Sequence, residues 1–222
     1  MNSNDVTVVM KQQAAKGVLT QTPLHHADLS SLAETHSDRQ SGIVLTERAL
    51  TGQLMIRVRG ELDAASSAVQ SAIGIGLPER LQFNGNPLNF HEPLLAWMSP
   101  DEWRLCCPHS DTFDCETKLR TSLSQVPGAS HAIVNNSGGF TVLDLSGQDV
   151  LKLLKKSTAY DVRDPRFPIG KVVGTSFAKT SVTLLRTGDN SWQLWVRRSF
   201  ADYVWLWLQD AAREYGLMIA EV

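Results

Sequence analysis

The chain has 222 residues, and its 21 basic and 23 acidic side chains give a formal charge of -2 at pH 7. A chain of this length buries roughly 70% of its unfolded surface, so a stable core needs neither a disulfide nor a metal. The balanced charge excludes the basic stripe typical of nucleic-acid binding, and no run of about 18 apolar residues is present to span a membrane.

Residues 1–41 form the first segment and are rich in Ser, Thr, Gln, Asn and His. They show no sustained hydrophobic period, which predicts an extended, weakly structured arm. The stretch TPLHHADL within the arm is apolar enough to dock onto another surface. The arm also lacks the continuous apolar region of a secretory signal.

A first α+β subdomain is predicted over residues 42–128. Alternating apolar residues in LMIRVR (54–59) indicate a half-buried strand. A helical stripe follows and ends at Gly74; its members are Ala65, Ala68, Val69, Ala72 and Ile73. The segments LLAWM and WRLCC flank the turn sequence SPDE and predict a hairpin. A second helix is expected over 113–124, where two leucines lie four residues apart.

A second α+β subdomain is predicted over residues 129–222, with the same order of elements. The sequence NNSGGF predicts a turn in which Gly138 and Gly139 adopt positive φ, and it leads into the strand FTVLDL. A helix is expected after Ser146. Two strands follow, SFAKTSVTLLR and SWQLWVR, joined by the turn TGDN, and a closing helix begins at Ser199.

Each half therefore contains the order strand, helix, hairpin, helix, the first over 53–124 and the second over 140–216. Hairpins that alternate with single helices are typical of two-layer α+β folds. The sequence predicts an α+β fold of two tandem two-layer subdomains, preceded by the extended N-terminal arm.

Four potential metal ligands lie close together near the start of the chain: His25, His26, Asp28 and His36. Adjacent histidines point apart in most backbones, and zinc needs three or four convergent ligands, so a surface or interface role is favoured over a metal site. Ser137 lacks the GxSxG elbow of serine hydrolases. Gly74 and Gly76 in the stretch IGIG follow a predicted helix, whereas a dinucleotide-binding loop follows a strand, so helix termination explains them better.

The remaining charged clusters have structural explanations. Asp101 and Glu102 lie in the predicted hairpin turn and are expected to be exposed. A Pro-rich loop holds two acidic and two basic residues that form either a solvated ion-pair patch or a clasp on a neighbour: Asp161, Arg163, Asp164 and Arg166. We therefore predict no catalytic, cofactor-binding or metal-binding residue in this chain.

Three cysteines, Cys106, Cys107 and Cys115, cannot form a balanced disulfide framework. Reduced thiols are typical of the cytoplasm, so we predict a cytoplasmic location.

The tryptophans near the C-terminus indicate where the chain contacts a partner. The closing helix has an apolar stripe whose members are Phe200, Tyr203, Val204, Trp207, Leu208, Ala211 and Tyr215. Trp205 falls at the boundary of this stripe and Leu206 lies in its polar sector, while Trp195 faces away from Trp192 on the preceding strand. A covered Trp stabilises by on the order of 4 to 6 kcal/mol, which favours an interface. The alternatives are scattered surface residues or a helix buried on all sides. The candidate interface residues are His25, His26, Trp195, Trp205 and Leu206.

Several long motifs closely resemble the gamma subunit of bacterial heterotetrameric sarcosine oxidase. They are PLHHADL, SPDEWRL, NNSGG followed by VLDLSGQDVLKLL, KKSTAYDVRDPRFPIGKVVGTSFAK and VRRSFADYVWLWLQDAAREYGL. The resemblance covers residues 23–218 and is strongest over 134–217.

The resemblance implies a subunit of a flavin-dependent oxidoreductase that oxidatively demethylates sarcosine to glycine. Electrons would pass through FAD and a covalently bound FMN to oxygen, giving hydrogen peroxide, and tetrahydrofolate would accept the one-carbon unit. FAD, FMN, NAD and zinc would be held by other subunits, with alpha, beta and delta subunits as partners and no nucleic acid or membrane. This chain would carry no active site.

The resemblance also implies a fold like that of the aminomethyltransferase (glycine cleavage T-protein) class. That class has a hairpin of the form RTGYTGEDGFE, of which this chain keeps Arg186, Thr187 and Gly188 but lacks the acidic run. The alternatives to a structural subunit are a stand-alone folate or one-carbon binding module, or the equivalent subunit of a related N-methyl amino acid dehydrogenase.

Overall fold

The computed structural model describes residues 20–36, 41–89 and 91–220. Its elements form an α+β fold built on two β-sheets, which confirms the predicted fold class. Within the described residues no helix is both long and apolar enough to cross a lipid bilayer.

The five-stranded sheet has the order β3-β4-β5-β2-β6 and is antiparallel throughout. Its strands are β2 (Thr51–Arg59), β3 (Phe83–Asn84), β4 (Leu94–Ser99), β5 (Glu102–Pro108) and β6 (Ser130–Asn135). Two helices cover its outer face, α2 (Leu62–Ile73) and α3 (Thr112–Ser124). The core between them contains alternate residues of each strand, such as Leu54, Ile56 and Val58 of β2, because successive side chains of a strand point to opposite faces.

The six-stranded sheet has the order β11-β1-β7-β10-β9-β8, in which β1 and β11 run parallel and the pairs from β7 to β8 are antiparallel. Its strands are β1 (Ile43–Arg48), β7 (Phe140–Ser146), β8 (Val172–Phe177), β9 (Thr180–Gly188), β10 (Ser191–Arg197) and β11 (Leu217–Ile219). The helices α1 (Leu29–His36), α4 (Val150–Ser157) and α5 (Ala201–Ala211) pack on its outer face. The described residues also contain three short 3₁₀ turns: η1 (His25–Ala27), η2 (His109–Asp111) and η3 (Arg198–Phe200).

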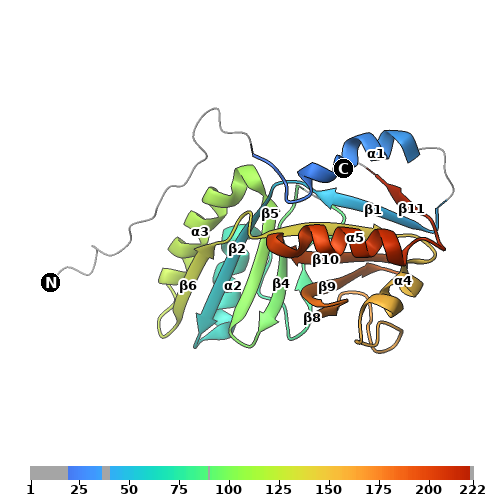
Figure 1. Ribbon diagram of the computed structural model, residues 1–222. Helices are drawn as coiled ribbons and strands as arrows, with labels where there is room; N and C mark the ends of the chain where they lie inside the picture. Colours follow the sequence, from blue (N-terminus) through green and yellow to red (C-terminus); the bar gives the residue numbers. More distant parts are fainter. Residues whose placement is uncertain (1–19, 37–40, 90, 221–222) are drawn as a thin grey trace.

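The inner faces of the two sheets share an apolar core, which we call the inter-sheet core. The five-stranded sheet supplies Leu94, Ala96 and Cys106, and the six-stranded sheet supplies Val142, Val172, Leu185 and Trp195. In Figure 1, α3 and α5 lie on opposite halves of the molecule, and each packs against its own sheet. Each sheet is therefore covered on both faces.

The predicted order of strand, helix, hairpin and helix is found over 53–124 with the short strand β3 added, whereas the second half has three strands between α4 and α5 instead of two. The sheets do not follow the predicted boundary at residues 128 and 129. The strand β1 joins the six-stranded sheet, and β6 joins the five-stranded sheet. The turn after β6 has positive φ at Gly138, as expected, but not at Gly139. This turn carries the chain from one sheet to the other, because β6 pairs with β2 whereas β7 pairs with β1 and β10.

The single strand predicted over 176–186 is wrong. Ala178 adopts a left-handed φ of 50° and its N–H bonds to the carbonyl of Ser157, so the chain turns there and forms the β8–β9 hairpin. The buried positions change phase at this turn, from Phe177 to Thr180 and Val182.

The N-terminal arm forms a 3₁₀ turn and a helix over residues 25–36 instead of an extended segment. Leu24 is buried, and Leu29, Leu32 and Ala33 pack against the core of the six-stranded sheet with helical spacing. Docking onto the chain's own sheet induces this structure, so the predicted extended arm is wrong for residues 25–36. Residues 1–19 and 37–40 of the arm lie outside the described residues.

Candidate functional site

The helix α5 presents two different apolar surfaces. Its buried face contacts the six-stranded sheet and contains Ala201, Val204, Trp205, Leu208 and Ala211. Its outer face carries Phe200, just before the helix, with Tyr203 and Leu206, which are 43%, 36% and 56% exposed. We call these three residues the α5 apolar surface. The buried stripe is thus rotated from the predicted one, which included Phe200 and Tyr203 and left Trp205 at its edge.

Two of the predicted interface residues are buried in the chain's own fold. Trp195 is fully buried in the inter-sheet core, and Trp205 is 6% exposed beneath α5. Neither side chain offers surface to another subunit, so an interface role is corrected to a core role for both. Leu206 lies on the outer face, and its contact with a partner stays a prediction.

His25 and His26 lie in η1 and are exposed. The Nε2 atom of His26 lies 2.7 Å from Oδ1 of Asp202 on α5. This contact joins the N-terminal segment to the helix that carries the α5 apolar surface. An interface role for the two histidines stays a prediction.

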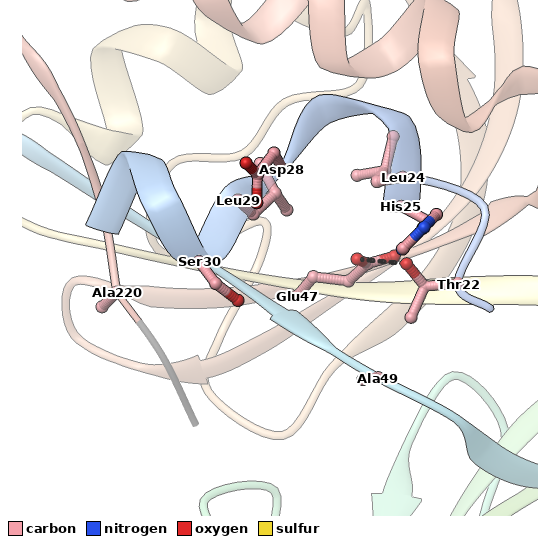
Figure 2. Close-up of a pocket in the computed structure, with 9 residues that line it drawn as sticks. All are labelled: Thr22, Leu24, His25, Asp28, Leu29, Ser30, Glu47, Ala49 and Ala220. Atoms are coloured by element: carbon pink, nitrogen blue, oxygen red, sulfur yellow. Dashed lines mark hydrogen bonds between the residues drawn. The ribbon is translucent and has the colours of Figure 1, made fainter. Parts of the chain in front are cut away.

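A cavity of about 420 Å³ opens beneath η1 and the first turn of α1 (Figure 2). Glu47 on β1 anchors its floor, accepting hydrogen bonds from Thr22 Oγ1 at 2.9 Å and from Thr141 Oγ1 at 2.6 Å. His25 and Asp28 line the cavity above this carboxylate. The paired oxygens of Glu47 hold the N-terminal segment on the sheet, which is a structural use of the carboxylate.

A chain of polar side chains crosses the inner face of the six-stranded sheet. Asp144 accepts hydrogen bonds from Arg48 Nε at 2.5 Å and from Gln193 Nε2 at 2.9 Å. Gln193 in turn accepts the indole N–H of Trp195 at 2.6 Å. Burial raises the pKa of Asp144, against the opposing effects of the Arg48 charge and these hydrogen bonds. These hydrogen bonds fix the Trp195 ring, and they occupy the Asp144 carboxylate.

We expect the Asp144 carboxyl to titrate above its usual pKa of about 3.9, because burial disfavours the charged form. A raised pKa means that the folded chain binds the proton more tightly than the unfolded chain. The stabilisation is complete below about pH 3.9 and is lost as pH rises through the folded pKa. Carbon-13 NMR of the carboxyl groups measures the midpoint.

Asp161 provides the internal control for this titration, because a hydrogen bond from Arg163 lowers its pKa to about 2. The two midpoints should therefore lie on opposite sides of the usual value in one set of spectra. A midpoint for Asp144 below about 3.9 would mean that the charge of Arg48 outweighs burial.

A second cavity, of about 490 Å³, opens at the edge of the inter-sheet core beside this polar chain. Arg48, Gln193, His91 and His109 contribute its polar lining, and Cys106 and Val142 contribute apolar lining. The space between the sheets beyond it is filled by the Trp195 ring and the other side chains of the inter-sheet core. A small ligand could enter this edge cavity but not the centre of the sandwich.

The remaining sequence candidates have structural partners. Asp101 and Glu102 form ion pairs with Arg59 at 2.7 Å and with Arg57 at 3.0 Å. Ser137 Oγ accepts the N–H of Gln53 at 3.0 Å. Gly74 in the IGIG stretch is the C-cap of α2 with a φ of 82°, as predicted.

The acidic residues of the Pro-rich loop form ion pairs within this chain. Asp161 pairs with Arg163 at 2.8 Å, and Asp164 pairs with the buried Arg186. Among residues 20–36, 41–89 and 91–220, no three His, Cys, Asp or Glu side chains converge as metal ligands.

Asp144, Gln193 and Arg104 were not among the residues predicted from the sequence. The signal was present, because each is a polar residue between two apolar ones on a strand whose two faces are both covered. Such a residue is buried and needs a partner, so a polar residue in a strand of this kind marks a site worth examining.

Comparison with known proteins gives a consistent result. The model of the sarcosine oxidase gamma subunit family matches residues 59–214. Sarcosine oxidase subunit gamma of Corynebacterium sp. (strain U-96) is 32% identical over 193 residues, which are 86% of this chain and 89% of that protein. The same subunit of an Arthrobacter species is 29% identical over 207 residues, 91% of this chain and 97% of that protein.

Two solved structures share the fold. A chain of the heterotetrameric sarcosine oxidase from Corynebacterium sp. U-96, in complex with pyrrole 2-carboxylate, is 28% identical, with a TM-score of 0.75. The match covers 92% of this chain and all of that one (100%). The glycine cleavage system aminomethyltransferase T from Bartonella henselae is 11% identical, with a TM-score of 0.63 over 92% of this chain and 60% of that protein. The second likeness concerns the fold alone, and it agrees with the fold predicted from the sequence.

Proposed function

Because the chain belongs to the sarcosine oxidase gamma subunit family, we propose that it is a structural, non-catalytic subunit of a heterotetrameric sarcosine oxidase. The observation that carries this proposal is the 32% identity to a sarcosine oxidase gamma subunit across 86% of the chain. The relative is covered over 89% of its own length, so the similarity extends to nearly the whole subunit rather than to one motif.

In this proposal the complex oxidises sarcosine to glycine, passes the one-carbon unit to tetrahydrofolate and passes electrons to oxygen, giving hydrogen peroxide. The alpha, beta and delta subunits are its partners and hold FAD, covalent FMN, NAD and zinc. The three thiols of this chain are free, which supports a reducing, cytoplasmic location.

The described residues of this chain do not fit those groups. Two carboxylates beside the cavities already have partners, since Asp144 is held by Arg48 and Gln193, and Glu47 by two threonines. The inter-sheet core fills the space that a flavin or pterin ring would need at the centre of the fold. The chain therefore contributes structure to the complex and no cofactor site. It offers a rigid fold with two covered sheets and an exposed apolar surface.

The α5 apolar surface is the proposed contact with a neighbouring subunit. Phe200, Tyr203 and Leu206 lie on one side of a helix whose other side is anchored in the core, so the surface is held rigid. Tyr203 is fixed further, because its hydroxyl accepts the backbone N–H of Lys179 at 3.2 Å. Preorganised aromatic side chains of this kind are common at the centre of interfaces.

Co-purification tests the proposal. The chain, carrying an affinity tag and expressed in its native host, is expected to bring down three other subunits in a yellow complex. Absorption spectroscopy detects the flavin, and the oxidation of sarcosine with release of hydrogen peroxide measures the activity. A colourless chain that purifies alone from a host with active sarcosine oxidase would contradict the proposal.

A stand-alone folate or one-carbon binding module is the second candidate, and the edge cavity of about 490 Å³ with Arg48 at its wall favours it. Equilibrium dialysis of the purified chain with tetrahydrofolate separates the two proposals. Micromolar binding by the isolated chain would support the module, whereas its absence would end it. The equivalent subunit of a related N-methyl amino acid dehydrogenase would differ in the substrate, which lies on another chain.

A further inference from the structure

Two cavities meet at the end of the sheet sandwich where β5 begins and β10 ends, separate from the edge cavity beside Arg48. Their volumes are about 480 and 320 Å³, and they share Arg104, Phe140 and Arg197. The larger cavity is also lined by Trp195 and Gly174 and by four hydroxyl side chains: Thr175, Ser176, Ser181 and Thr183. The smaller one adds Met55, Asn136, Gly139 and Ser199.

Arg104 is a buried cation for which the described residues provide no ion pair. It is 5% exposed, and its Nη1 atom has no hydrogen-bond partner. Its guanidinium carbon lies 3.7 Å from the centre of the Phe140 ring and 5.8 Å from that of Trp195, so aromatic faces hold it in place. Burial lowers the pKa of Arg104, as expected for a charge removed from water. A buried charge without a counterion is costly, and proteins normally pair it.

The charged side chains that line these two cavities are both arginines. Arg197 is exposed at the rim of the cavities, with its guanidinium carbon 6.0 Å from the same Phe140 ring. The lining residues of the two cavities include two arginines and neither Asp nor Glu. The nearest acid along β5, Glu102, already pairs with Arg57 at 3.0 Å. The cavities therefore offer a positive field, hydroxyl groups and aromatic walls to a ligand.

We propose that the Arg104–Arg197 cavities bind an organic carboxylate. A guanidinium stacked on an aromatic ring keeps its edge free for the paired hydrogen bonds that a carboxylate accepts. The aromatic walls of Phe140 and Trp195 and the apolar side chain of Val182 suit the carbon part of such a ligand better than they suit inorganic phosphate. The inference concerns this chain alone and stands independently of the proposed subunit role.

Titration of the full chain with benzoate tests the site, with benzamide as the neutral ligand of the same shape and inorganic phosphate as the inorganic anion. Thermal stabilisation at constant ionic strength measures binding, because a ligand of the folded state raises the unfolding temperature. Benzoate is expected to stabilise the chain more than either comparison ligand. Equal effects of benzoate and benzamide would overturn the proposal.

Three variants locate the binding in these cavities. Arg104→Met is expected to weaken benzoate binding by at least about tenfold, since it removes the charge-assisted hydrogen bonds. Arg197→Gln is expected to weaken it less, because that residue lies at the exposed rim. Gly174→Leu keeps both charges but blocks the larger cavity, where a Cβ at Gly174 meets no atom within 4 Å and the backbone accepts any residue.

The Arg104→Met variant also separates binding from a purely structural role. Without carboxylate it is expected to unfold at the same temperature as the unchanged chain or higher, because an unpaired buried charge is replaced by an apolar side chain of similar length. Arg198→Gln is the matched control, since Arg198 is the exposed neighbour of Arg197 and lines neither cavity. Benzoate binding that survives both Arg104→Met and Gly174→Leu would overturn the proposal.

Repeating the benzoate titration on the assembled complex distinguishes a free carboxylic acid from an acidic side chain of a neighbouring subunit. If benzoate stabilises both the isolated chain and the complex in an Arg104-dependent manner, the ligand is a free carboxylic acid. If only the isolated chain responds, an acidic side chain of a neighbouring subunit occupies the cavities in the complex. If neither responds, the cavities are not a carboxylate site.

Discussion

Replacing Leu206 with aspartate is expected to release the chain from its complex while leaving its own fold intact. Leu206 is 56% exposed on the outer side of α5, next to Phe200 and Tyr203, so the substitution disturbs no core contact. A charge placed at the centre of an apolar interface loses its water on assembly and costs about 2 kcal/mol or more, a loss of roughly 30-fold in affinity. The measurement is the amount of partner protein that co-purifies with the tagged variant.

Leu62→Asp is the matched control, because Leu62 is a leucine with similar exposure, 44%, at the start of α2 on the other half of the molecule. It should leave assembly unchanged. Circular dichroism and thermal unfolding of both isolated variants should match the unchanged chain. If Leu206→Asp assembles normally, or if Leu62→Asp fails to assemble instead, the α5 apolar surface is not the contact.

Trp205→Ala, unlike Leu206→Asp, is expected to lower the unfolding free energy of the isolated chain. Trp205 is 6% exposed and packs in the core under α5, so its removal leaves a large cavity beside the six-stranded sheet. Substitutions of this kind cost about 3 to 5 kcal/mol of unfolding free energy. Chemical denaturation of the isolated chain measures the change.

The neighbouring variant Leu206→Ala should change the unfolding free energy by no more than about 0.5 kcal/mol, as an exposed position does. Two adjacent residues then report on two different processes, folding and assembly. A Trp205→Ala chain of normal stability that fails to assemble would restore Trp205 to the interface and contradict its burial.

The helical period correctly predicted a closing helix but gave the wrong orientation for it. The buried face contains residues 201, 204, 205, 208 and 211, which is regular helical spacing. Phe200 precedes the helix in η3, and including it in the stripe rotated the predicted face toward Tyr203 and Trp207. Leu206 was placed correctly in the outward sector. Phase errors of this kind arise because a helix boundary is decided by local backbone geometry that hydrophobicity does not encode.

Strand positions were predictable, and strand partners were not. Alternating residues located β2 and β10, and the turn sequence SPDE located β4 and β5 on either side of it. The pairing of β1 with β7 and of β6 with β2 depends on contacts between distant segments, about which local patterns carry no information. The missing partner of Arg104 could not be predicted either. Only the folded structure shows that its Nη1 atom has no hydrogen-bond partner among the described residues.

The parallel pairing of β1 with β11 has a consequence for the order of events during synthesis. The five-stranded sheet is complete once residue 135 has been made, but β1 waits for β7 and then for a last strand that ends at Ile219. Nearly the whole chain must leave the ribosome before the six-stranded sheet can close, and such distant contacts form slowly. Until then the edge of β1 that pairs with β11 remains unpaired. A chaperone or a partner subunit that binds during this interval would act before the subunit has its final shape.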